Sequence, residues 1–187
     1  MSPPSVLTLG AFWGLSEILL GVSKRSRGRA ESRDRNSLRI IWAVDFACIA
    51  LAFVAAARLP QAQLPQTTHL YWLALFLFAA GVVLRWYSII YLGRFFTTNV
   101  AIAADHQLID SGPYRLVRHP SYAGAMLTFI GFGLGFGNLI SLLIVTAPVL
   151  AVLMWRIRIE EEALLEAFGD QYRYYMKRTK RLIPLIY

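Results

Sequence analysis

Long apolar runs, separated by short polar segments, dominate the chain. A membrane-spanning helix needs about 20 apolar residues, with a range of roughly 17–25. Five runs approach or reach that length, at residues 3–22, 38–59, 69–92, 120–136 and 139–155. Only Gly137 and Asn138 separate the last two runs, which are the shortest, so these two predict a helical hairpin. The pattern predicts an all-α integral membrane protein with about five transmembrane helices.

The pattern changes after residue 155, where apolar positions alternate with charged ones. Apolar side chains recur with helical spacing at Leu164, Leu165, Phe168, Tyr172, Tyr175 and Met176. This spacing is typical of an amphipathic helix. We therefore expect a C-terminal amphipathic helix that lies on the cytoplasmic face of the membrane or folds back over the ends of the spans.

Composition supports lipid as the solvent for much of the chain. Hydrophobic residues make up 57% of the 187 residues and charged residues 16%, against roughly 45–50% and 25% in soluble domains. These values exclude a disordered chain and a coiled coil. The single cysteine, Cys48, excludes a disulfide scaffold, and the three scattered histidines predict no metal site.

The net charge of +8 comes from basic residues gathered in three segments, at residues 24–39, 94–118 and 156–181. With five spans these segments all fall on one side of the membrane, and only Arg58 falls on the other. Because cytoplasmic loops collect Lys and Arg, the N-terminus is predicted outside and the C-terminus in the cytoplasm. The membrane is then bacterial inner membrane or endoplasmic reticulum, and the basic charge suits anionic membrane lipids rather than nucleic acid.

Three ionisable residues lie inside the apolar runs: Glu17, Asp45 and Arg85. By residue count, Asp45 and Arg85 both lie roughly 10 Å from the cytoplasmic ends of their spans. Unpaired charges at that depth cost several kcal/mol. We expect either a structural bridge between Asp45 and Arg85, joining the second and third spans, or a shared place in the wall of an active site.

The first candidate chemistry lies where a polar segment meets the fourth run. The sequence there reads Asp-Ser-Gly-Pro-Tyr-Arg-Leu-Val-Arg-His-Pro-Ser-Tyr, over residues 110–122. A residue before proline is disfavoured in the helical conformation, and proline suits the first turn of a helix. Arg118 and His119 are therefore predicted beside a helix N-terminus, which favours an anionic ligand group.

A second cluster, Arg156 followed by Glu160, Glu161 and Glu162, comes at the end of the fifth run. Arg156 and Glu160 are four residues apart and share a helix face, so an ion pair within the helix is one interpretation. Three successive carboxylates at a membrane boundary favour the other interpretation, in which at least one of them binds a ligand.

Together these motifs resemble a known family. Arg118-His-Pro-Ser-Tyr122, followed by Glu160-Glu161 and by Phe168-Gly169-Asp-Gln-Tyr172, resembles the isoprenylcysteine carboxyl methyltransferases. It is equally similar to their bacterial membrane relatives and to the phospholipid N-methyltransferases. The resemblance covers roughly residues 92–184 and leaves the first 90 residues without an assigned motif.

The resemblance implies S-adenosylmethionine as cofactor, in a pocket that faces the cytoplasm and is closed by the C-terminal helix. Residues 93–187 would form the cofactor-binding and catalytic region, and residues 1–92 three N-terminal transmembrane helices. The implied cofactor-binding residues are His106, Leu108, Ile109, Tyr114, His119, Pro120, Ser121, Tyr122 and Glu160. Arg156 corresponds to an arginine on the substrate side, and Arg156 and His119 are the candidate catalytic residues.

The expected reaction is transfer of a methyl group to a lipophilic acceptor that enters from the bilayer. A carboxylate acceptor is ionised at neutral pH and needs no base, and Arg156 suits a bidentate contact with it. An amine or thiol would need a proton removed by His119 or a glutamate. The alternatives are a phospholipid or small-molecule N-methyltransferase, a membrane sterol-type reductase that uses NADPH, and a small structural or transport protein.

Overall fold

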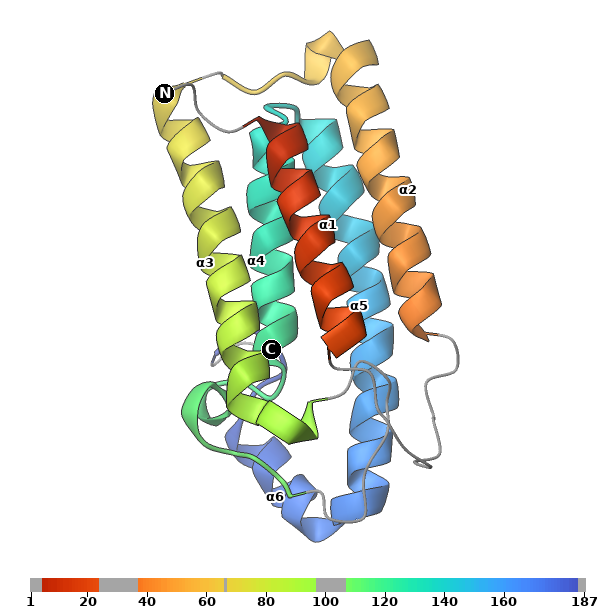
Figure 1. The fold of residues 1–187 in the computed structure, drawn as a ribbon, viewed down its shortest axis with the longest axis vertical. Helices are drawn as coiled ribbons and strands as arrows, with labels where there is room; N and C mark the ends of the chain where they lie inside the picture. The colour runs from red at the N-terminus through yellow and green to blue at the C-terminus, as the bar shows by residue number, and fades with distance from the viewer. Residues whose placement is uncertain (1–4, 24–36, 66, 97–106, 185–187) are drawn as a thin grey trace.

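The computed structural model is an all-helical bundle, as the sequence predicts (Figure 1). It describes residues 5–23, 37–65, 67–96 and 107–184. The long helices are α1 (Val6–Ser23), α2 (Ser37–Arg58), α3 (Thr68–Leu92), α4 (Pro120–Gly135) and α5 (Leu139–Phe168). The shorter ones are η1 (Pro60–Ala62), η2 (Gly93–Phe95), η3 (Gly112–Arg115) and α6 (Asp170–Arg178).

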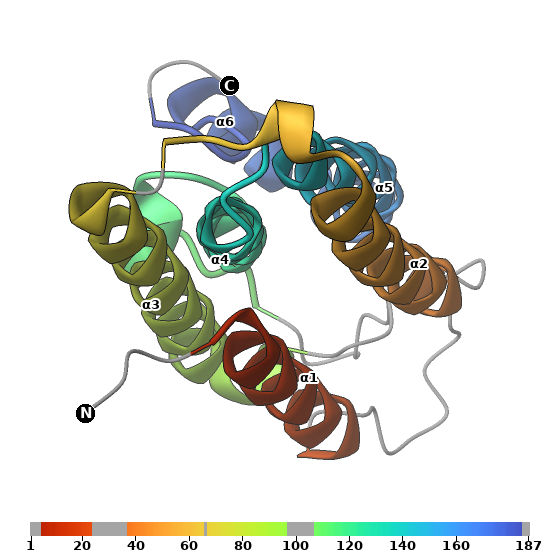
Figure 2. The ribbon, with the colours of Figure 1, turned by 90° about the horizontal axis from the view of Figure 1, so that it is seen from above.

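Each of the five apolar runs forms a helix, and four of these helices, α1, α2, α3 and α5, are long and apolar enough to cross a membrane. The other, α4, has 16 residues. Seen from above, α4 occupies the centre of the bundle, with α3, α5 and α1 around it (Figure 2). A central helix is shielded from lipid by its neighbours, so it does not need the full spanning length.

Glycines bring α3 and α4 into close contact. A Cβ atom on Gly124 of α4 would lie 2.6 Å from the backbone nitrogen of Arg85 in α3, and Gly81 and Gly131 are equally crowded at the same interface. Small residues allow this approach, which is common between membrane helices. The close approach places Arg85 against the start of α4, where its Nη1 donates to the Ser121 carbonyl at 3.3 Å.

The predicted C-terminal amphipathic helix is present as α6, with Tyr172 and Tyr175 buried, but it begins later than the pattern suggests. We expected a separate helix after residue 155, but α5 continues without a break to Phe168 and has 30 residues. At 1.5 Å per residue it is about 45 Å long, against roughly 30 Å for the hydrocarbon core. Charged residues alone do not end a helix. The break comes at Gly169, whose φ is +52°, and α6 follows it.

Two sets of polar contacts lie at opposite ends of α5, and the second joins the segments on either side of it in the chain. At the start of α5, Ser141 Oγ donates to the Ala52 carbonyl of α2 at 2.8 Å, and Asn138 Nδ2 donates to the Leu59 carbonyl at 2.9 Å. Past the other end of α5, the backbone nitrogens of Arg118 and His119 donate to the carbonyls of Lys180 and Arg181, at 2.8 and 3.0 Å. The segment after α6 therefore lies beside the residues that begin α4.

Candidate active site

His119 lies between two successive glutamates of α5. Its Nδ1 is 3.5 Å from Glu160 Oε2, and its Nε2 is 3.4 Å from Glu161 Oε1. Pro120 begins α4, so His119 takes a non-helical conformation just before it, with φ −124° and ψ 60°. Neighbouring residues of a helix diverge by about 100°, which leaves room for one imidazole between the two carboxylates. The predicted proximity of His119 and Glu160 is present in the structure.

This arrangement favours the charged form of His119. Burial by itself lowers the pKa of His119, but the hydrogen bonds and charges of Glu160 and Glu161 outweigh it, and the pKa is raised above its ordinary value of 6.5. A protonated imidazole holds a carboxylate in place and is a poor base near neutral pH. The geometry therefore suits His119 to positioning Glu160.

The raised pKa predicts a pH-dependent stability. The contribution of protonated His119 to the free energy of unfolding is complete below pH 6.5, and it is lost as the pH rises through the folded-state pKa of His119. The expected loss is up to about 1.4 kcal/mol per pH unit while the group titrates. Thermal unfolding in neutral detergent from about pH 6 to about pH 9 measures it. His119→Gln should flatten the profile, and His69→Gln, at an exposed position on α3, should not. A parent profile that rises over this range would contradict the assignment.

Glu161 is the centre of a buried ionic cluster that sequence reasoning missed. Its side chain is 4% exposed and accepts from Arg118 Nε at 2.8 Å and from Arg181 Nη2 at 2.7 Å. Arg118 also donates to the carbonyls of Met176 and Thr179. The cluster thereby joins α5, the residues before α4 and the segment after α6. Two features of the sequence could have indicated this cluster. They are the second carboxylate of the Glu160-Glu161 pair and the arginine of the motif at residues 118–122.

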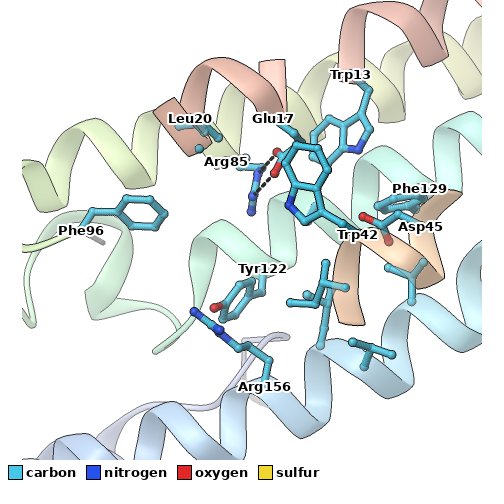
Figure 3. A pocket seen from close by; sticks show the side chains of 16 residues that line it. Trp13, Glu17, Leu20, Trp42, Asp45, Arg85, Phe96, Tyr122, Phe129 and Arg156 are labelled. Carbon is cyan, nitrogen blue, oxygen red and sulfur yellow. Dashed lines mark hydrogen bonds and ion pairs between the residues drawn. The ribbon is translucent and has the colours of Figure 1, made fainter. Parts of the chain in front are cut away.

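Arg156 and Glu160 share a face of α5, as predicted, and each also lies beside a residue from the start of α4. Glu160 is directed to His119, whereas Figure 3 shows the Arg156 guanidinium beside the hydroxyl of Tyr122. Arg156 is 3% exposed although it lies at the end of the apolar part of α5. The three side chains stand at the boundary between the buried bundle and the charged end of the molecule.

Arg156 and Tyr122 also border a cavity of about 60 Å³ inside the bundle. Trp13, Trp42 and Phe129 give it an aromatic lining. The cavity is therefore a largely apolar space that ends at a buried arginine.

The charged groups of this cavity correct one prediction. Arg85 does not bridge to Asp45. It forms a bidentate pair with Glu17, with Nε–Oε1 and Nη2–Oε2 distances of 2.7 Å (Figure 3). The spacing placed Arg85 and Asp45 at similar depth, but it gave no information on the orientation of α1, which carries Glu17. All three residues line the cavity, and the second alternative, a shared place in the wall of an active site, stays a prediction.

The other predicted site residues that the structure describes lie at the start of α4 or in the residues that precede it in the chain. Pro120 and Ser121 are buried in its first turn. The Tyr114 hydroxyl donates to the Ser88 carbonyl at 3.3 Å, and burial together with the nearby Glu160 carboxylate raises the pKa of Tyr114. Leu108 and Ile109 are half-buried in the segment before η3. His106 lies outside the described residues.

Comparison with known proteins supports the resemblance seen in the motifs. A family model for phospholipid methyltransferases matches residues 69–171. The chain is 36% identical to protein-S-isoprenylcysteine O-methyltransferase of Schizosaccharomyces pombe over 108 residues, which cover 57% of this chain and 46% of that protein. It is 30% identical to a probable protein-S-isoprenylcysteine O-methyltransferase of Oryza sativa subsp. indica over 144 residues, which cover 74% of this chain and 75% of that protein.

The fold has a solved counterpart. The structure of the eukaryotic intramembrane Ras methyltransferase, an isoprenylcysteine carboxyl methyltransferase, superposes with a TM-score of 0.69 and 22% identity, and it covers all of this chain and 70% of that one. The match spans about half the length of the Schizosaccharomyces relative and of a second relative, from Arabidopsis thaliana. On the family model and the rice relative, the chain belongs to the family of integral membrane methyltransferases that includes the isoprenylcysteine carboxyl methyltransferases.

Proposed function

We propose that the chain is an S-adenosylmethionine-dependent methyltransferase that transfers a methyl group to the carboxylate of a lipophilic acceptor. One observation carries this proposal: Arg156 stands where the aromatic cavity of the bundle meets the His119–Glu160 pair. The acceptor atom must approach the methyl group of the donor directly, so the two binding regions must adjoin. At this boundary an apolar binding region adjoins a polar one. The carboxylate acceptor also follows the names of the relatives, which are O-methyltransferases.

The residues at the charged end fit the cofactor. When bound, S-adenosylmethionine supplies a methyl group on a sulfonium, which is already activated for displacement. The Glu160 side chain is 32% exposed and held by His119, so it can accept hydrogen bonds from ribose hydroxyls. The positive end of the α4 dipole, at its first turn, suits the cofactor's carboxylate. We propose that His106, Leu108, Ile109, Tyr114, Glu160 and residues 119–122 hold it.

The chain's own residues then orient the acceptor. Arg156 presents a planar guanidinium that matches a carboxylate through two parallel hydrogen bonds. Trp13, Trp42 and Phe129 line the space for the apolar part and keep water away. Orientation in a dry site contributes several kcal/mol to a displacement that needs no proton transfer. For an amine acceptor, by contrast, a proton must leave, and the raised pKa of His119 favours its charged form, which has already bound a proton.

A lateral cleft between α1 and α2 offers the acceptor a route from the bilayer. It has a volume of about 330 Å³ and is lined by apolar residues such as Leu7, Phe46 and Phe53. We propose that residues 1–92 form this route and one side of the acceptor cavity, which Phe129 and Arg156 help to complete, and that residues 93–187 hold the cofactor. The charged end of the bundle then faces the cytoplasm, with the N-terminus outside, in a bacterial inner membrane or the endoplasmic reticulum.

Phospholipid N-methylation is the second candidate, because the matching family model describes phospholipid methyltransferases. Membership of this family argues against the NADPH reductase that the motifs alone left open. The purified protein, supplied with radiolabelled S-adenosylmethionine, separates the two candidates. N-acetyl-S-farnesylcysteine is the carboxylate acceptor, and phosphatidylethanolamine is the amine acceptor. Methyl transfer to phosphatidylethanolamine alone would replace the proposal with the second candidate.

Replacement of Arg156 by methionine is expected to lower kcat/KM for the farnesylcysteine acceptor by about 100-fold, since it removes one partner of a buried charged contact. Affinity for S-adenosylhomocysteine should change much less. Arg158→Met is the matched control, because Arg158 is exposed on the same turn of α5. Equal losses in both variants, or a loss of cofactor affinity that accounts for the whole effect, would contradict the role given to Arg156.

A further inference from the structure

Asp45 is a carboxylate inside the bundle whose hydrogen-bonding capacity is not used. The nearby Glu17 carboxylate is fully engaged, because Arg85 donates to both of its oxygens at 2.7 Å. Asp45 has no hydrogen bond or salt bridge to any residue that the structure describes. Asp45 is half-buried, and ionisable residues within membrane spans pair or serve a function. The Glu17–Arg85 pair explains two of the three charges in this region and leaves Asp45 unexplained.

Asp45 lies where the two open spaces of the bundle meet. The inner cavity, of about 60 Å³, and the lateral cleft, of about 330 Å³, share four lining residues, which are Trp13, Glu17, Trp42 and Asp45. Figure 3 shows the Asp45 carboxylate turned into this space, with the ring of Trp42 close by. A chain that passes from the cleft towards Arg156 therefore passes Asp45.

The register of α2 and α5 gives the separation between Asp45 and Arg156 along the bundle. The two helices are antiparallel (Figure 1), and the hydrogen bond from Ser141 to the Ala52 carbonyl sets them level at that point. Asp45 is seven residues before Ala52 in α2, and Pro148 is seven residues after Ser141 in α5, so Asp45 and Pro148 lie at the same level. Arg156 is eight residues beyond Pro148, which corresponds to about 12 Å along a helix.

We infer that Asp45 is a specificity-determining residue that accepts a hydrogen bond from a hydroxyl or ammonium group on the apolar chain of the acceptor, about 12 Å from the carboxylate that Arg156 holds. The inference deepens the proposed function and rests on it for the place of the carboxylate. An acceptor that carries such a donor satisfies Asp45, whereas a plain hydrocarbon chain leaves it without a partner. The Trp42 ring close to the carboxylate (Figure 3) further suits an ammonium group, because indole faces attract cations.

Binding of fatty acids to the purified full-length protein in neutral detergent tests this inference without any turnover. The probes are plain acids, ω-hydroxy acids and ω-amino acids of matched lengths from octanoic to hexadecanoic acid. Because Trp13 and Trp42 line the space, tryptophan fluorescence reports binding. At one intermediate length, the ω-hydroxy and ω-amino acids should bind roughly tenfold more tightly than the plain acid, as expected for a hydrogen bond to a charged group.

Asp45→Asn should remove the preference for the ω-amino acid, since an amide carries no charge, and should reduce the preference for the ω-hydroxy acid. Asp170→Asn makes the same chemical change at a side chain that is 94% exposed on α6, and both preferences should persist in it. Equal affinities for plain and substituted acids in the parent, or unchanged preferences in Asp45→Asn, would overturn the inference. Failure of the proposed function would be a separate result, namely no binding of S-adenosylhomocysteine and no methyl transfer. The ratio of the affinities for substituted and plain acids could still be measured in that case.

Discussion

Replacement of Glu160 by glutamine is expected to weaken binding of S-adenosylhomocysteine by about 100-fold and to abolish methyl transfer at ordinary cofactor concentrations. Glu160 is the carboxylate that His119 positions at 3.5 Å, and it faces the charged end of the bundle. Glutamine keeps the shape of the side chain but removes the charge that pairs with His119. Calorimetric titration of the detergent-purified protein measures the affinity.

The glutamate triplet supplies its own controls for this experiment. Glu162 is exposed on the same turn of α5, so Glu162→Gln should bind S-adenosylhomocysteine like the parent. Glu161→Gln should mainly lower thermal stability, because Glu161 holds Arg118 and Arg181. If Glu160→Gln retained parental affinity while Glu161→Gln lost it, the cofactor-binding role would belong to Glu161.

The apolar pattern predicted the helices well because the length of a membrane helix is set by the bilayer, and such runs leave few alternatives. The start of α4 was also predictable, since the His119–Pro120 pair restricts the backbone at that point. The end of α5 was not predicted correctly. Arg156 marks the end of the apolar run, but only Gly169, with its positive φ, ends the helix.

The candidate site, like the helices, could be predicted from the sequence only in part. The proximity of His119 and Glu160 followed from the motifs, because both residues belong to segments that the resemblance joins. The partner of Arg85 did not follow, since Glu17 lies 68 residues away in a helix that carries no motif. Sequence spacing gives the depth of a charge in a span but not the face of the bundle to which it points. For the same reason, the place of Asp45 between the cleft and the cavity required the structure.

Replacement of Arg85 by leucine is expected to lower the free energy of unfolding by about 3 kcal/mol, because it leaves the Glu17 carboxylate unpaired inside the bundle. The side chains of Arg85 and Glu17 are 12% and 19% exposed. The pair is a principal link between α1 and the rest of the bundle, together with the hydrogen bond from Trp86 Nε1 to Ser16 Oγ at 2.7 Å. Unfolding by denaturant in mixed detergent micelles, followed by circular dichroism, measures the change.

The double variant Glu17→Leu/Arg85→Leu separates pairing from packing. It removes both charges, so it should recover much of the stability that Arg85→Leu loses, and the difference gives the coupling energy of the pair. Because α1 forms one wall of the cavity proposed for the acceptor and no predicted cofactor residue lies on it, Arg85→Leu should bind farnesylcysteine more weakly and S-adenosylhomocysteine almost normally. A double variant no more stable than Arg85→Leu would mean that Arg85 acts mainly through its contacts with Trp13 and the Ser121 carbonyl. Loss of cofactor affinity would instead mean that α1 also holds the catalytic half in place.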